Sequence, residues 1–102
     1  MTNIDADEFQ KDHERLEYLY NRAQEMHKFV KAASGDKSRT VALRHLVVGI
    51  NDFDEHVRRF IHKYPSYYED NKEKLDKVME ANILFLSSVI TSLSALSHEQ
   101  LN

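Results

Sequence analysis

Cysteine is absent from this 102-residue chain, and turn-forming residues are scarce, with two glycines and one proline. The lack of cysteine excludes disulfides and metal sites built from thiolates. The scarcity of glycine and proline points to long helices joined by few turns. The first ten residues are acidic and lack the basic start and apolar run of a secretory signal, so the expected location is the cytoplasm.

A strong excess of charge of either sign is also lacking. The chain has 14 Lys and Arg residues against 17 Asp and Glu residues, which gives a formal net charge of −3. This value is too small to indicate a nucleic-acid partner. Charged residues make up 30% of the chain and hydrophobic ones 41%, a balance typical of a soluble helical protein. The length fits a single domain over residues 1–102.

An apolar stretch near the end of the chain, residues 75–96, has the strongest helical pattern. Its main seam repeats at steps of four and three residues and consists of Leu75, Met79, Asn82, Leu86, Val89, Leu93 and Leu96. Four further apolar residues widen this seam: Val78, Ile83, Phe85 and Ile90. No charged residue lies between Glu80 and Glu99. Because the pattern is that of an α-helix that is apolar well beyond one stripe, we expect it to be covered on most sides.

The uncharged segment from Ala81 to His98 raises the question of a membrane span. Its 18 residues include seven serine, threonine and asparagine residues. A spanning helix needs about 20 predominantly apolar residues. We therefore interpret the segment as a buried helix of a bundle, and we expect no membrane partner.

Two earlier stretches show the same heptad spacing. The first seam contains Phe9, Leu16, Leu19, Ala23, Met26, Val30 and Ala33, and the second contains Leu43, Leu46, Ile50, Phe53, Val57, Phe60 and Tyr64. The expected N-caps are Asp5, Asp36 or Ser38, and Ser66, with Gly35 as a left-handed turn residue and Pro65 as the stop of the second helix. The sequence thus predicts helices over about residues 5–34, 38–64 and 66–97. Short turns favour an all-α, antiparallel up-down-up three-helix bundle.

The third predicted helix carries more apolar surface than two neighbouring helices can cover. We therefore expect association with a protein partner or with a second copy, most simply as a dimer, through its Phe85, Ser88 and Ser92 side or its Leu84 and Thr91 side. Asn82, a polar residue on the seam, is of the type that fixes the register of an oligomer. A second candidate binding surface is the corner formed by Tyr64, Tyr67 and Tyr68, because tyrosine is common in protein interfaces.

The five residues from His45 to Gly49 are similar to the His-x-x-x-Gly core of histidine phosphotransfer domains, which are helical bundles of about this size. This resemblance implies a phosphorylated His45 as an alternative function. The sequence departs from that pattern in two places, since Val48 stands where a basic residue is usual and Ile50 and Asn51 replace small polar residues.

Other reactive constellations are missing from the sequence. No pair of histidines or carboxylates has the inward-facing spacing of a bundle metal site, and no nucleophile or acid–base pair suggests an enzyme. We expect neither a cofactor nor a metal. The basic residues of the second helix and its preceding loop leave nucleic-acid binding as a weak alternative: Lys37, Arg39, Arg44, Arg58, Arg59 and Lys63. The favoured function is non-catalytic protein binding, as in a small regulator, inhibitor, immunity-type protein or assembly adaptor.

Overall fold

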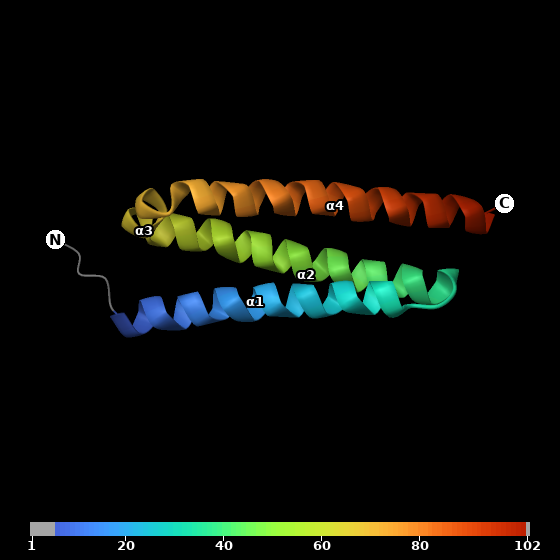
Figure 1. The fold of residues 1–102 in the computed structure, drawn as a ribbon, viewed down its shortest axis with the longest axis horizontal. Helices are drawn as coiled ribbons and strands as arrows, with labels where there is room; N and C mark the ends of the chain where they lie inside the picture. Colours follow the sequence, from blue (N-terminus) through green and yellow to red (C-terminus); the bar gives the residue numbers. More distant parts are fainter. Residues whose placement is uncertain (1–5, 102) are drawn as a thin grey trace.

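The computed structural model describes residues 6–101, with side chains described through residue 96, and this part of the chain is helical without any strand. Its four helices are α1 (Ala6–Ala32), α2 (Asp36–Lys63), α3 (Pro65–Asp70) and α4 (Lys72–Leu101). Figure 1 shows the three long helices side by side, with α2 antiparallel to both α1 and α4. The all-α prediction is confirmed. The predicted start at Asp5 lies outside the described residues.

The turn between α1 and α2 depends on Gly35. This residue has a φ of +86°, which side-chain-bearing residues rarely adopt, and it is the N-cap of α2. Its ψ of 156° places it outside the left-handed helical conformation expected for it. The prediction that Asp36 or Ser38 caps α2 is wrong, because no side chain caps this helix. Helix α2 already begins at Asp36, so both residues lie inside its first turn.

The third predicted helix is in fact two helices, interrupted at Asn71. Pro65 ends α2, as predicted, and occupies the first position of α3, where a missing backbone donor costs nothing. Ser66 therefore lies inside α3, and the predicted cap from its side chain is wrong. The amide Nδ2 of Asn71 donates to the carbonyl oxygen of Tyr67 at 2.9 Å and so satisfies one end of the short helix. Helix α4 continues beyond the predicted end at residue 97.

The core lies along one side of α2. Besides Gly49, the buried residues in the described chain are Leu19, Ala23, Thr40, Leu43, Leu46, Ile50, Phe53, Val57, Phe60, Tyr64, Leu75, Val89 and Leu96. Gly49 allows α1 and α2 to approach closely, since a Cβ atom there would lie 2.6 Å from the sulfur of Met26. Helix α2 therefore supplies most of the buried side chains.

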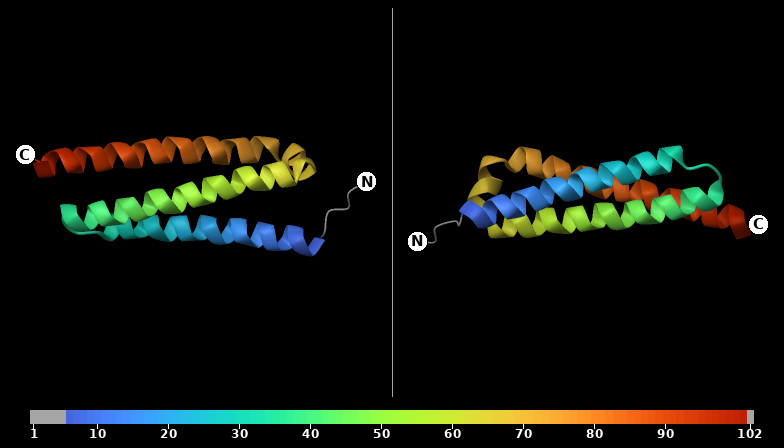
Figure 2. Two further views of the ribbon diagram at one scale, coloured as in Figure 1. Left: turned by 180° about the vertical axis from the view of Figure 1, so that it is seen from behind. Right: turned by 90° about the horizontal axis from the view of Figure 1, so that it is seen from below.

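Helices α1 and α4 flank α2 and do not pack backbone to backbone. In the described part of the chain, no Cα atom of α1 comes within 8 Å of a Cα atom of α4. In the view from below, Figure 2 shows α4 passing at an angle behind α1 and α2. Contact between the flanking helices is made by side chains, such as the rings of His27 and Phe85, whose centroids are 5.0 Å apart. Two sides of α4 therefore lack a helix against them.

Candidate protein-binding surface

The side of α4 that faces away from α2 forms an uncharged, exposed strip. We call this strip the outer face of α4 and define it as the exposed residues Ala81, Leu84, Ser88, Thr91 and Ala95. Leu84 is 64% exposed, and Ile83 and Ile90, which lie farther around the helix on one flank of the α2-facing seam, are 52% and 53% exposed. Large apolar side chains therefore remain in water, as the predicted apolar excess of this helix requires.

Hydroxyl groups on this side of α4 bond to their own helix. The side chain of Thr91 donates to the carbonyl oxygen of Ser87 at 2.9 Å, and Ser92 donates to that of Ser88 at 3.1 Å. Such bonds to the preceding turn satisfy a hydroxyl without water. A second helix can therefore cover Thr91 and Ser92 without leaving their hydroxyl protons unpaired.

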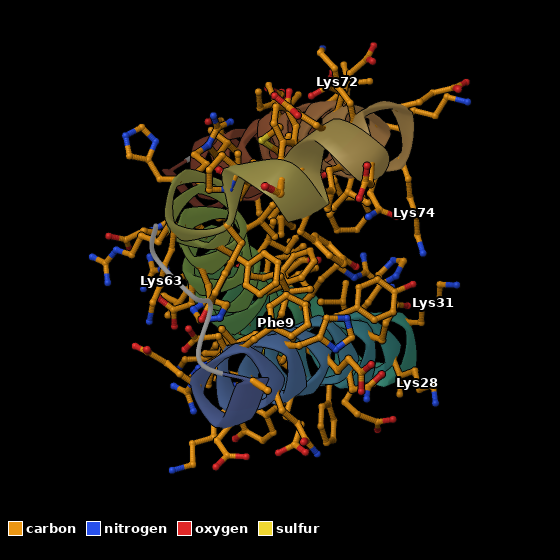
Figure 3. All side chains as sticks on the ribbon, turned by 90° about the vertical axis from the view of Figure 1, so that its left-hand side faces the viewer. Phe9, Lys28, Lys31, Lys63, Lys72 and Lys74 are labelled. Carbon is orange, nitrogen blue, oxygen red and sulfur yellow. The ribbon has the colours of Figure 1, made fainter. Side chains whose placement is uncertain are left out.

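A groove runs beside the outer face, between α1 and α4. It has a volume of about 480 Å³, and its floor is formed by Leu46, Ile50 and Phe53 of α2. Ala81 and Phe85 line its α4 side together with Lys74 and Lys77. Figure 3 shows Lys74 pointing outward from α4, away from the rings at the centre. The groove is thus apolar inside with cations at its rim.

Asn82 forms its bond within the chain. Its Nδ2 donates to a carboxylate oxygen of Asp54 on α2 at 3.3 Å. The other carboxylate oxygen of Asp54 pairs with Arg58 at 2.9 Å. The polar position on the seam therefore aligns α4 with α2. The predicted role of Asn82 in fixing the register of an oligomer is separate from this bond and stays a prediction.

The predicted tyrosine corner is part of a packed aromatic end. We use this name for the cluster Phe9, His13, Phe60, Tyr64 and Tyr67, whose ring centroids lie 4.8 to 6.2 Å apart in the pairs that touch. Figure 3, which looks along the helices from this end, shows Phe9 among the rings at the centre. Tyr64 is only 3% exposed, and Tyr67 is half-buried. This corner mainly holds the helices together.

A polar network beside the aromatic end ties the start of α1 to the end of α2. The carboxylate of Asp12 accepts hydrogen bonds from the hydroxyl of Tyr64 at 2.6 Å and from the ammonium of Lys63 at 2.8 Å. Lys63 also binds Glu8. The hydrogen bonds from Lys63 and Tyr64 lower the pKa of Asp12, while burial and the bond to Asp12 raise the pKa of Tyr64. Sequence reasoning missed this network.

Tyr68 is engaged on the other side of the α3–α4 junction. Its hydroxyl donates to Asp76 at 2.6 Å, and Lys72 donates to the other oxygen of the same carboxylate at 2.7 Å. The hydrogen bond to Asp76 raises the pKa of Tyr68, and the bonds from Lys72 and Tyr68 lower the pKa of Asp76. All three predicted tyrosines therefore have structural contacts within the chain.

His45 lies in a different part of the surface. It is exposed and borders an apolar depression of about 770 Å³ at the α1–α2 turn, together with Met26, Phe29 and Val41. Sequence reasoning missed this depression. Phe29, which is 68% exposed and lies off the predicted seam, could have indicated it, because a phenylalanine is unusual on a polar helix face. The close packing of Gly49 against α1 gives this glycine a structural role that is independent of any phosphorylation at His45.

Three of the six basic residues of α2 form ion pairs with acidic ones. Arg58 binds Asp54, Arg59 binds Glu55 at 2.8 Å, and Lys63 takes part in the network around Asp12. These pairs reduce the positive field that a nucleic acid would require. Within the described residues, no group of three or more metal-ligating side chains is present.

Helix α4 is long and apolar enough to cross a bilayer, judged by length and composition alone. Within the segment Lys72–Leu96, the most apolar window of 18 residues has a mean hydropathy of 1.5, and only 6% of that window is buried. The interpretation of this stretch as a buried helix is therefore wrong for a single chain, because α2 covers only one side of α4.

No protein-family model matches the sequence, and no curated protein or solved structure matches it reliably.

Proposed function

We propose that this protein is a non-catalytic protein-binding module that acts through the outer face of α4. The observation that supports this proposal best is the 64% exposure of Leu84 on this face, within a stretch that is uncharged between Glu80 and Glu99. Contiguous exposed apolar surface is typical of interaction sites on soluble domains. A small regulator or assembly adaptor is the class of protein that these features fit.

A protein partner explains α4 better than a bilayer does. The middle of α4 is bonded through Asn82 to Asp54, and Asp54 is bonded to Arg58. Insertion of α4 would either break this contact or carry the charges of α2 into the lipid, at about 2.5 to 3.5 kcal/mol for each charged residue. A partner that covers only the outer face leaves the contact with α2 intact.

Site-specific photo-crosslinking of the full chain in its host tests this function. A photoreactive phenylalanine analogue is placed at Leu84 and, as a matched control, at Val48, which is 53% exposed on α2. We expect protein adducts from position 84, and we expect Thr91→Glu on the same face to abolish them. Equal adducts from both positions, adducts that survive Thr91→Glu, or adducts with lipid alone would contradict the proposal.

A further inference from the structure

We infer that the depression at the α1–α2 turn binds a free anionic amphiphile, a small molecule with one apolar chain and one carboxylate head. This inference goes beyond the proposed function, because the described lining of the depression comes from α1, α2 and the turn between them. Its volume of about 770 Å³ lies within the range of small-molecule sites, about 300 to 1,000 Å³. Of the nine described residues that line it, six are apolar and the others are Lys37, Ser38 and His45.

The apolar part of the depression suits a chain that lies along the helices. Phe29 on α1 is 68% exposed and Val41 on α2 is 52% exposed, so both gain from being covered by an apolar group. Residues 37, 41 and 45 lie on one side of α2 and span about 12 Å at 1.5 Å per residue. A bound chain therefore has room to extend from Lys37 toward His45.

Charge selects an anionic head at Lys37. Among the lining residues that the structure describes, Lys37 is the only lysine or arginine, and none is an aspartate or glutamate. Its side chain forms no ion pair or hydrogen bond with a described residue. Residues 26–51 contain five basic residues and one acidic residue, Asp36, whereas the whole chain has a net charge of −3. A carboxylate beside Lys37 thus lies in a locally positive field and completes an ion pair that the chain itself does not supply.

The extent of the apolar surface favours a single small molecule over a bilayer. Arg22 precedes Met26 by four residues on α1, and Asp52 follows His45 by seven on α2, so both lie on the side of the depression. Arg22 and Asp52 form an ion pair at 3.4 Å and limit the apolar surface at that end. A bilayer resting on this side would remove the ion pair from water, whereas a ligand within the depression leaves it hydrated.

Isothermal titration calorimetry of the purified full chain with decanoate, kept below its micelle concentration, tests the site. We expect saturable binding of one decanoate per chain. Decyltrimethylammonium, which has a similar apolar chain and a cationic head, should bind at least about 10-fold more weakly, because its head lies against Lys37. Equal binding of the two compounds, or no saturable binding of decanoate, would overturn the inference.

Two pairs of matched variants locate the binding. Val41→Glu places a carboxylate inside the depression and should weaken decanoate binding by about 100-fold or more. Val48→Glu is its control, because Val48 is 53% exposed on the same helix but does not line the depression. Lys37→Gln should weaken binding by about fivefold, whereas Lys31→Gln, at an exposed lysine outside the lining, should not. Binding that survives Val41→Glu, or equal losses within either pair, would overturn the site.

Vesicles of phosphatidylglycerol distinguish a free ligand from a lipid surface. A chain that cosediments with these vesicles but does not bind decanoate would overturn the free amphiphile as the ligand. Circular dichroism verifies that all four variants are folded. Since photo-crosslinking at position 84 reports on α4 and decanoate binding reports on the α1–α2 turn, the proposed function and this inference can fail separately.

Discussion

Large side chains are buried at the aromatic end and exposed on the outer face of α4. At the aromatic end, Phe60 and Tyr64 are 3% exposed and pack against rings from α1 and α3. On the outer face, Leu84 is 64% exposed and the neighbouring residues are small. The apolar side chains of the aromatic end pack against one another and hold the helices together. The second region keeps its apolar surface available, and this difference is why we assign binding to α4 and not to the tyrosine corner.

Truncation of Phe60 should give the largest effect and the clearest contrast between the two regions. Phe60→Ala removes a buried ring that contacts Phe9, Tyr64 and Tyr67, and we expect it to lower the free energy of unfolding by about 3 to 5 kcal/mol. Leu84→Ala, measured by urea unfolding at low concentration, should change it by less than about 0.5 kcal/mol. Similar losses for both variants would remove the distinction.

Enlarging a small residue should separate the two helix contacts. Gly49→Leu forces a side chain into the space held by Met26 and Ala23, and we expect a loss of about 1 to 3 kcal/mol in unfolding free energy. The same change at the exposed Ser88 should leave the stability of the monomer unchanged or slightly higher, since leucine is the better helix former. Met26→Ala should recover part of the Gly49→Leu loss. No recovery would mean that the strain lies elsewhere.

The network around Asp12 predicts a pH dependence of the aromatic end. Because the pKa of Asp12 is lower in the folded chain, its contribution is present above its unfolded value of about 3.9 and is lost as the pH falls through the folded pKa. We expect Asp12→Asn to cost about 1 kcal/mol at pH 7. The difference from the wild type should shrink toward zero in unfolding curves measured at successively lower pH. Glu14→Gln, an exposed control, should show neither effect.

Two neighbouring arginines should give the smallest effects and should rank in a set order. Arg59 and Glu55 form an exposed pair, with side chains 76% and 56% exposed, so Arg59→Ala should cost less than about 0.5 kcal/mol. Arg58 binds Asp54, which is only 14% exposed and also accepts the bond from Asn82. Thermal unfolding should therefore show a larger decrease in melting temperature for Arg58→Ala than for Arg59→Ala. The reverse order would argue against Asp54 as the link to α4.

The helices and their buried seams could be predicted from the sequence because they depend on local spacing. The all-α class, the stop at Pro65 and the apolar excess of α4 follow from such patterns. The helix caps could not be predicted in this way. Gly35 is the N-cap of α2 and Pro65 is the first residue of α3, so the nearby polar residues Asp36 and Ser66 lie inside the helices that they were expected to cap. The pairing of Asp12 with Tyr64 was also missed. These residues are 52 positions apart, and their contact depends on how α1 is aligned along α2.

The candidate site was predicted in part for the same reason. The spacing of Leu84, Ser88 and Thr91 is local, and the structure places all three on the exposed side of α4. The tyrosines of the corner were judged by residue type, and residue type does not reveal that Tyr64 packs under Phe9 or that Tyr68 binds Asp76. The identity of a partner also depends on the surface of that partner. The sequence of this chain describes only its own helices.

The break at Asn71 has a consequence for how the molecule opens. Helix α4 is joined to the rest of the chain at this single non-helical residue and packs along one side only, so it can detach as a unit while the α1–α2 hairpin stays folded. Segments of this kind unfold locally at a lower free energy than the whole domain. We therefore expect amide hydrogens of α4 to exchange sooner than those of α2, with occupancy of the outer face slowing exchange in α4 first.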